Sequence, residues 1–501
     1  MRQLTSLDAQ FLAIEDGRNH AHVSVIGIYE PETAAGRRLD ADVLRGLVQD
    51  RLHLLPPFRW RLASVPFGID HPYWVDDRSF DPEFHIRELA LPAPGDDHQL
   101  AEQVGRLHSR PLDRGRPLWE MYVIHGLESG RVAMMAKTHH AAIDGVSGAE
   151  LLGVLLDTSA EGRELPPPPA QRPGERLPSD VALFGRSLLR LPLQPLRALR
   201  SAPRALPNLE HVPTLRAVPG AGRLAATKAR GIARRDDGGR LEGPTPRAPR
   251  TRFNGRISPH RRFAFATLPL DDVKALKGVL GVTVNDVVLA VCAGALRRRL
   301  TAADELPSEP LVAMVPVSVR APEEQGTFGN RISVMIVPLP TNEPDPRRRL
   351  ERVHEVMRAA KERHQAVPAT LLQDTNQFVP PALLARASRV VGSLAAHPRF
   401  APPLNVVISN VPGSPAPLFL AGARQQAQYP VSVIMDGAAL NITVLSYRDG
   451  LDFGVVGDRE LAPDVWELIE DLRLELADLR ELLPTPLAAA RRGTAEKEAT
   501  K

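Results

Sequence analysis

The residues that offer chemistry gather in one short segment, KTHHAAIDGVSG (137–148). The segment contains two adjacent histidines, His139 and His140, followed by Asp144 and Gly145. An imidazole ring can bind a metal ion, accept a proton near pH 7, or be held by hydrogen bonds within a buried turn. The segment therefore predicts a metal site, a general base or a structural turn.

The spacing of the two histidines disfavours a metal site. Adjacent side chains at the end of a strand point to opposite faces, so His139 and His140 should not share one ion. A metal site also needs several converging ligands, as HExxH supplies on a helix, and no further histidine or cysteine cluster lies nearby in the sequence. We expect no bound metal.

The elements predicted around the histidines favour a base. RVAMMAKTHH (131–140) has the pattern of a short buried strand, and SGAELLGVLLD (147–157) that of a helix with Ser147 near its N-terminus. A tight turn at Asp144 and Gly145 would connect them and could present one imidazole to a cleft. Neutral imidazole can take a proton from a hydroxyl group. Because no GxSxG motif supplies a serine nucleophile, a direct, base-assisted transfer fits better.

The apolar patterns predict two mixed α/β domains, residues 1–160 and 263–487, followed by a disordered tail at 488–501. In the first domain, the expected elements also include a strand at 22–30 and a helix at 39–55. In the second domain, we expect helices at 270–281, 284–300 and 463–483, and strands at 261–270, 311–319, 331–339, 404–412, 440–447 and 451–458. Cys292 lies in one of these helices, where a small buried hydrophobe is expected rather than a reactive thiol.

The two domains are connected by a proline- and arginine-rich segment, residues 161–262. Frequent proline forbids one long helix, so a solvated linker is the simpler interpretation. The alternative is an amphipathic segment that lies on an anionic membrane or lipid surface. The arginines that support this alternative are Arg186, Arg190, Arg197, Arg200 and Arg204. Nucleic acid is not expected as a partner, because no aromatic interleaving or known motif accompanies the charge.

The composition limits the class of protein. A chain of 501 residues with 43% hydrophobic residues is long enough for two globular cores. The 63 basic and 59 acidic residues nearly cancel, so the net charge of +4 indicates no particular partner. A single cysteine excludes an internal disulfide and fits a reducing compartment. Because we find neither a secretory signal nor an apolar window of about 20 residues, we expect a cytoplasmic protein, bound at most peripherally to the inner membrane face or to lipid droplets.

Several motifs in a fixed order give the sequence a family resemblance. HHAAIDG (139–145) matches the HHxxxDG signature of coenzyme-A-dependent acyltransferases, a superfamily that includes chloramphenicol acetyltransferase and peptide-synthetase condensation domains. The other motifs are LTSLDAQFLAIED, RPLWE, TVNDVVLAVCAGALRR, VPVSVR, GNRIS, SNVPGS and LNITVLSYRDGLDFGVVGD. Together they resemble the bacterial wax ester synthase/diacylglycerol acyltransferase family over nearly the whole chain outside the linker and the tail.

The resemblance implies a fold and a reaction. The fold would be α/β, with α+β mixed sheets in two chloramphenicol-acetyltransferase-like domains and a channel at their interface. The enzyme would move a fatty acyl group from acyl-CoA to diacylglycerol, with long-chain alcohols as a further class of acceptor. Acyl-CoA would be a substrate, and no cofactor is expected. A membrane or lipid-droplet surface would be a peripheral partner, because diacylglycerol resides there.

The resemblance also implies roles for single residues of the histidine segment. His140 would be the general base, and His139 would support the loop. Asp144 would anchor the loop through an ion pair, and Gly145 would leave room for substrate to approach the base.

Outside that segment, the ND motif is the main candidate. Asn285 would help to hold or polarise the thioester carbonyl, while an ordinary helix N-cap at Asn285 or Asp286 is the alternative. We assign no catalytic role to DFG (452–454). Residues expected to line or brace the channel are Pro117, Leu118, Trp119, Gly329, Asn330 and Ser333.

Two rival functions stay open at this point. The first is a condensation-type acyltransferase that takes its acyl group from a carrier protein. The second is a lipid-droplet or membrane-binding protein whose catalysis is vestigial. The intact HHxxxDG segment counts against the second, and the PLW, ND and GNxxS motifs count against the first.

Overall fold

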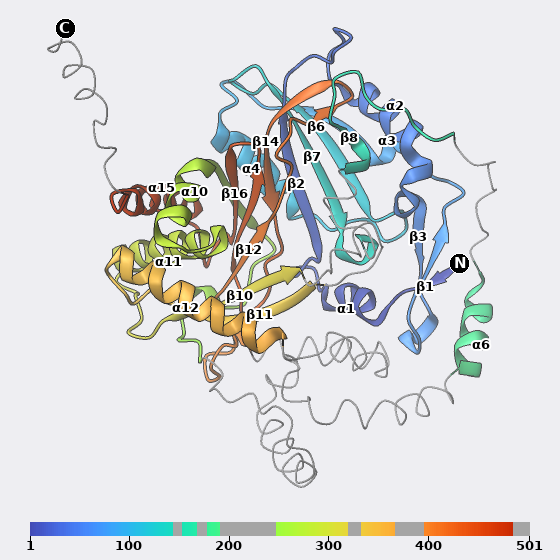
Figure 1. Cartoon of the computed structure of the whole chain (residues 1–501). Coiled ribbons are helices and arrows are strands. Elements are labelled where there is room, and N and C mark those ends of the chain that lie inside the picture. The colour runs from blue at the N-terminus through green and yellow to red at the C-terminus, as the bar shows by residue number, and fades with distance from the viewer. Residues whose placement is uncertain (144–152, 168–177, 191–246, 319–331, 366–394, 484–501) are drawn as a thin grey trace, which may run out of the picture.

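Two mixed β-sheets form the framework of the molecule (Figure 1). The computed structural model describes residues 1–143, 153–167, 178–190, 247–318, 332–365 and 395–483. A seven-stranded sheet has the order β5-β6-β7-β2-β14-β13-β8, and a six-stranded sheet has the order β11-β10-β12-β15-β16-β9. A small third sheet has the order β1-β4-β3. The predicted mixed α/β fold is confirmed.

The described elements have the following bounds. The seven-stranded sheet contains β2 (His22–Tyr29), β5 (Ile86–Ala90), β6 (Trp119–His125), β7 (Val132–His139), β8 (Leu156–Asp157), β13 (Phe419–Leu420) and β14 (Ala423–Val431). The six-stranded sheet contains β9 (Arg261–Pro269), β10 (Leu311–Ser318), β11 (Ile332–Leu339), β12 (Val406–Val411), β15 (Leu440–Tyr447) and β16 (Gly450–Asp458). The small sheet contains β1 (Arg2–Gln3), β3 (Trp60–Ala63) and β4 (Tyr73–Asp76). The helices are α1 (Ser6–Ile14), α2 (Ala41–Arg51), α3 (Pro82–His85), α4 (Asp97–His108), α6 (Asp180–Arg190), α10 (Leu270–Leu280), α11 (Val284–Ala302), α12 (Pro346–Gln365) and α15 (Val465–Arg480).

Helix α11 forms the centre of the C-terminal core. Thr283 is its N-cap, and Asp286 closes a capping box with it, which satisfies two of the free backbone N–H groups of the first turn. The run that follows is apolar on every face, as expected for a helix surrounded by protein. Cys292 lies in this run, fully buried, and burial raises the pKa of its thiol well above the usual range. The prediction that Cys292 is a buried hydrophobe is confirmed.

Strand β14 joins the two halves of the chain. It comes from the C-terminal half but pairs antiparallel with β2, with Gln428 opposite Gly27 and Val431 opposite Ser24. Figure 1 shows it as an orange strand beside the blue β2. The seven-stranded sheet is therefore built from both halves of the chain. The backbone N–H and C=O groups of β2 and β14 along their shared edge are satisfied by each other.

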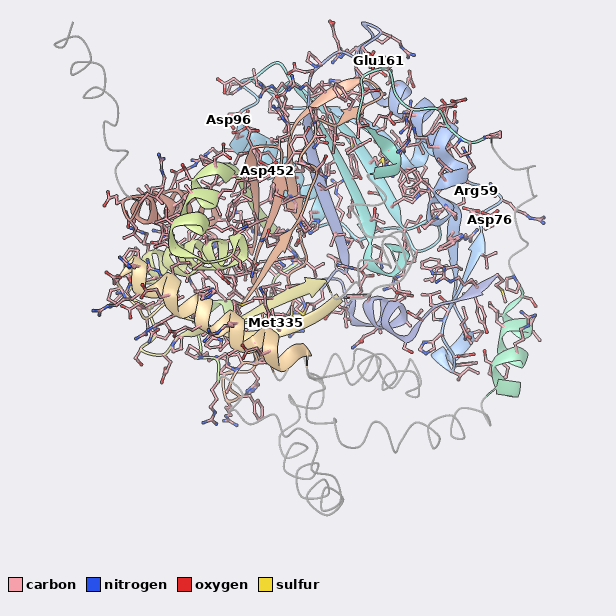
Figure 2. The ribbon with its side chains drawn as sticks, viewed as in Figure 1. Arg59, Asp76, Asp96, Glu161, Met335 and Asp452 are labelled. Atoms are coloured by element: carbon pink, nitrogen blue, oxygen red, sulfur yellow. The ribbon has the colours of Figure 1, made fainter. Side chains whose placement is uncertain are left out.

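Strand β14 also packs closely against β16 in the other sheet. Asp452 on β16, labelled in Figure 2, accepts hydrogen bonds from Gln428 N of β14 at 2.7 Å and from Thr267 Oγ1 at 2.6 Å. Burial raises the pKa of the Asp452 carboxyl to about 6. Two residues further, a Cβ atom on Gly454 would overlap the carbonyl oxygen of Pro430 in β14. The DFG segment therefore has an architectural role at the contact between the sheets.

Most elements predicted from the sequence are confirmed within one to four residues of their ends. The exception is the helix expected at 147–157. Residues 153–155 are helical, but the last two residues form strand β8, which pairs with β13, and residues 144–152 lie outside the described part. The sequence could not indicate this pairing, because β13 is more than 250 positions away.

Membrane-spanning potential is low in the described residues. No single helix there is both long and apolar enough to cross a bilayer, and α10 with α11 would pass that test only as a pair bent by 108°.

The close approach of the two sheets gives a testable prediction. We expect Gly454→Ala to lower the free energy of unfolding by about 2 kcal/mol or more, because the added methyl group meets backbone that cannot rotate away. Gly46→Ala in α2 is the matched control. No atom lies within 4 Å of the new Cβ at Gly46, so this change should raise stability by about 0.5–1 kcal/mol. Urea unfolding of both variants measures the difference, and equal effects would contradict the assigned contact.

Candidate active site

His139 and His140 lie where β7 ends. His139 is the last residue of β7 and pairs with His22 of β2. His140 begins a single 3-10 turn, η4 (His140–Ile143). Helix α1 packs against this turn and lies at the ends of β2 and β7 (Figure 1). The predicted strand-to-loop position of both histidines is confirmed.

Helix α1 starts and ends at positions that the sequence specifies. Thr5 is its N-cap, and Asp8 returns the interaction as the third residue of a capping box. The helix ends at Ile14, and Glu15 continues in an extended conformation. Phe11 and Glu15 are four residues apart, so both can face the histidine turn.

Glu15 holds His139. Its Oε1 atom lies 3.2 Å from His139 Nε2. The other ring nitrogen, Nδ1, accepts a hydrogen bond from Ala141 N at 3.0 Å. Because Nδ1 is an acceptor, the ring is neutral and its proton resides on Nε2, directed at Glu15. The buried His139 ring is thus fixed in one tautomer and cannot reach substrate.

Glu15 is itself held in the ionised form. Burial alone would raise its pKa, but hydrogen bonds from His139, from Arg114 at 2.7 Å and from Ala21 N at 3.0 Å bring the pKa down to about 2. Hydrogen bonds to the charged form favour that form. The carboxylate therefore connects α1, the start of β2 and the end of β7.

His140 has different surroundings. Its backbone N–H donates to Ala21 O at 2.8 Å, and its ring stacks on Phe11 with 4.6 Å between centroids and 13° between planes. The ring is only half-buried, in contrast to that of His139. Burial of the ring lowers the pKa of His140 to about 4. At neutral pH this imidazole is uncharged and able to accept a proton.

The PLW segment braces the same turn. Leu118 is fully buried beside Ala141 and Ala142, and its carbonyl accepts the His139 N–H at 3.0 Å. Trp119, the first residue of β6, donates from its indole nitrogen to Phe58 O at 2.9 Å and stacks on the Phe58 ring. Pro117 directly precedes them. Leu118 thus braces the histidine turn and Trp119 packs against Phe58, while the predicted role of these residues in lining or bracing a channel stays a prediction.

One group of described side chains has the composition of a metal site. Ligand atoms of Glu15, His20 and His22 lie within 4.8 Å of one another. However, the Glu15 oxygens already accept hydrogen bonds, and the positive charges of Lys137 and Arg261 act on the His20 ring. A cation would have to compete with both. The group does not include His139 or His140.

The ND motif lies on α11, in the other half of the chain. Its N-cap is Thr283, so the expectation of an N-cap at Asn285 is wrong, whereas Asp286 takes part in the cap as the third residue of the capping box. Asp286 accepts from Thr283 N at 2.9 Å and also lies 2.8 Å from His354 Nδ1, which is a structural role. Asn285 Oδ1 is 3.5 Å from Asn410 Nδ2 of the SNVPGS motif. No hydrogen bond among the described residues joins Asn285 to His140, so its part in catalysis stays a prediction.

Several other predicted residues lie outside the described part. These are Asp144, Gly145, Gly329 and Asn330. Ser333 lies in β11, opposite Val317. The predicted channel also stays a prediction. Residues 144–152, which follow the histidine turn directly in the chain, lie outside the described part.

Phe11 and Glu15 are site residues that were not predicted from the sequence. Both belong to the LTSLDAQFLAIED motif, which gave only a family resemblance. Their spacing of four residues next to a capping box was the available signal, since it places an aromatic ring and a carboxylate on one side of a helix end.

Known proteins share both the sequence and the fold. The profile of the wax ester synthase/diacylglycerol acyltransferase (WS/DGAT) catalytic domain matches residues 4–288, and that of the WS/DGAT C-terminal domain matches residues 328–480. A Mycobacterium tuberculosis protein, provisionally named a diacylglycerol O-acyltransferase, is 38% identical over 490 residues, which cover 95% of this chain and 99% of that protein. A second protein of that organism with the same kind of name is 37% identical over 484 residues, covering 95% and 98%.

Solved structures agree with these matches. A wax ester synthase/diacylglycerol acyltransferase from Marinobacter aquaeolei VT8 superposes with a TM-score of 0.67 and 30% identity, covering 96% of this chain and 99% of that one. The first condensation domain of the calcium-dependent antibiotic synthetase gives a TM-score of 0.52 at 17% identity over 97% of this chain and 98% of that one, which is a likeness of fold alone.

The low pKa of Glu15 predicts a pH-dependent cost of removing its charge. The folded pKa of about 2 lies below the ordinary value of 4.5, so the ionised carboxylate stabilises the fold above pH 4.5, and this contribution is lost as the pH falls through 2. We expect Glu15→Gln to lower the free energy of unfolding by about 3 kcal/mol at pH 7 and by much less near pH 2. Urea unfolding at several pH values measures this. Glu102→Gln, in an exposed pair with Arg106, is the control and should cost about 0–1 kcal/mol.

The surroundings of His140 predict its titration. In protein labelled with ¹³C-histidine, the His140 resonance should titrate near pH 4. Phe11→Ala removes the stacked ring and admits water, so it should move the midpoint toward 6.5. A midpoint near 6.5 in the unaltered protein would contradict the environment assigned to His140.

Proposed function

The chain belongs to the wax ester synthase/diacylglycerol acyltransferase family of acyltransferases, and we propose that it transfers a fatty acyl group from acyl-CoA to diacylglycerol. The products are triacylglycerol and free CoA. The observation that carries this proposal is the half-buried, uncharged His140 at the end of β7, held on Phe11 while His139 is bound to Glu15. Only one ring of the pair is free to act on a substrate.

His140 is the general base in this proposal. The acceptor hydroxyl oxygen attacks the thioester carbonyl carbon, a C–O bond forms, and His140 takes the hydroxyl proton. The C–S bond then breaks, and the imidazolium passes the proton to the departing CoA sulfur, which restores neutral His140. A base with a low pKa is a strong acid once protonated, and a free thiol has a pKa of about 8.5, so the last proton transfer is downhill.

The acceptor class follows from the family and from the reaction. Any hydroxyl that reaches His140 beside a thioester could be acylated, so long-chain alcohols are the second acceptor class and would give wax esters. Asn285 is proposed to orient the thioester carbonyl from the other half of the chain. No cofactor takes part, and acyl-CoA supplies the activated acyl group. Because diacylglycerol is a membrane lipid, we propose that the enzyme works in the cytoplasm at the inner membrane face or on lipid droplets.

Two rival functions were considered. A condensation-type enzyme would use an acyl group on a carrier protein, and the likeness to such enzymes extends only to the fold. A vestigial lipid-binding protein would have no use for a histidine pair held in two separate environments. Radiolabelled acyl-CoA offered with diacylglycerol and hexadecanol in competition decides between these functions and ranks the two acceptors. Failure to acylate either acceptor would favour the rivals.

The assigned base predicts the effect of its removal. His140→Ala should lower kcat about 10²–10⁴-fold with little change in KM for acyl-CoA, because proton transfer is lost while binding surfaces stay. The control is His260→Ala, an exposed histidine outside the site, which should keep full activity. Circular dichroism checks that both variants are folded. Activity of His140→Ala within a factor of three of the unaltered enzyme would overturn the assignment.

A further inference from the structure

An aromatic side chain projects into solvent from a turn beyond β3. Phe67 lies in the turn η3 (Pro66–Gly68), and 85% of its surface is exposed. Its backbone has φ +59°, in the left-handed region that a bulky side chain rarely adopts. A phenylalanine this exposed, held in a strained backbone conformation, contributes little burial to the fold, which indicates a function for the ring.

Helix α6 packs beside this turn and adds to the exposed apolar surface. Leu183 anchors the helix, because it is buried against Val65 and Tyr73. Phe184 lies with its ring 6.0 Å from that of Phe67, and Val181, three residues earlier on the same side of the helix, is 81% exposed. Phe67, Val181 and Phe184 therefore form one convex apolar patch, here named the α6 patch.

The α6 patch lies directly behind the active-site turn. In the small sheet, Leu62 and Trp74 face one way and pack with Ala141 and Ala142 of the histidine turn. Their neighbours Ala63, Tyr73 and Val75 face the other way and pack with Leu183 of α6. Because side chains alternate along a strand, this one sheet separates the patch from the turn that carries His140.

The sequence of α6 and of the chain that follows it is basic. Asp180 and Arg186 are both exposed on α6, and from Asp180 to Leu209 the sequence has five arginines and one acidic residue. Apolar side chains beside basic ones are the combination that inserts into an anionic lipid surface. We propose that the α6 patch docks on an anionic phospholipid bilayer, with Phe67 and Val181 inserted among the lipid chains.

A bilayer fits this patch better than a protein partner does. The two most exposed side chains protrude, and a fluid lipid surface accepts protruding groups without a complementary pocket. The inference rests on the proposed function in one respect, since an acceptor dissolved in a membrane requires the enzyme to bind there. It adds which surface binds, and it brings the His140 turn to the lipid side of the molecule.

Flotation with vesicles of phosphatidylcholine and phosphatidylglycerol, without diacylglycerol or acyl-CoA, tests the proposal. The unaltered protein should float with these vesicles, and less so with pure phosphatidylcholine or at high salt. Phe67→Asn combined with Val181→Gln should lower the partition coefficient roughly ten- to a hundredfold. Asparagine tolerates a positive φ and glutamine favours helix, so the double variant should fold, which its melting temperature verifies.

Leu474→Gln is the matched control. Leu474 is 51% exposed on α15, which Figure 1 shows on the opposite side of the molecule from α6. This variant should float like the unaltered protein. Equal flotation of the double variant, or equal binding to neutral and anionic vesicles, would overturn the proposal. So would light scattering that shows a dimer converted to a monomer by the double variant, because the patch would then bind a second copy.

The two proposals fail in different experiments. His140→Ala should float normally, because the vesicles carry no substrate. Transfer to detergent-dispersed diacylglycerol tests the reaction without a bilayer. Flotation without transfer would refute the proposed function alone, whereas transfer without flotation would refute the docking surface alone.

Discussion

The pairing of β14 with β2 is the constraint on which the rest of the molecule depends. A strand from the C-terminal half completes the sheet of the N-terminal half, and on its other side it lies close enough to β16 that only glycine fits at position 454. The two halves cannot separate without breaking a row of backbone hydrogen bonds, which is costly in a buried sheet. Since β7 is the other neighbour of β2, the histidines have a fixed position relative to the C-terminal helices.

On this frame, a small number of contacts separates the two histidines by role. The same helix, α1, supplies a carboxylate for His139 and an aromatic ring for His140. The contact with Glu15 fixes the tautomer of His139 and occupies the Nε2 atom of its ring. The second holds a ring flat while leaving it partly exposed. Two identical side chains in adjacent positions thus have different surroundings, because successive residues at the end of a strand point to different neighbours.

The sequence predicted the elements that depend on local pattern and missed those that depend on distant partners. The sequence predicted the strands with apolar runs, such as β7 and β16, and the long helix α11. The pattern of apolar residues in each of them indicates by itself that the element is buried. Strand β14 was not predicted, because ARQQAQYPV is mostly polar and one of its glutamines, Gln425, accepts a hydrogen bond from Tyr29, 396 positions away. Glu15 was missed for the same reason, since its partner His139 is a neighbour in space alone. Helix α11 is capped by Thr283 and not by Asn285. Because the N-cap lies two positions before Asn285, the Asn285 side chain does not have that role.

The burial of Cys292 inside α11 has a practical consequence. The chain has no other sulfhydryl group, and this one is shielded from solvent and kept protonated. Thiolate is the form of cysteine that alkylating agents and peroxides attack, so this thiol should be inert toward both in the native enzyme. A cysteine introduced at any surface position would therefore be the sole point of attachment for a fluorophore or spin label, without prior removal of a native one.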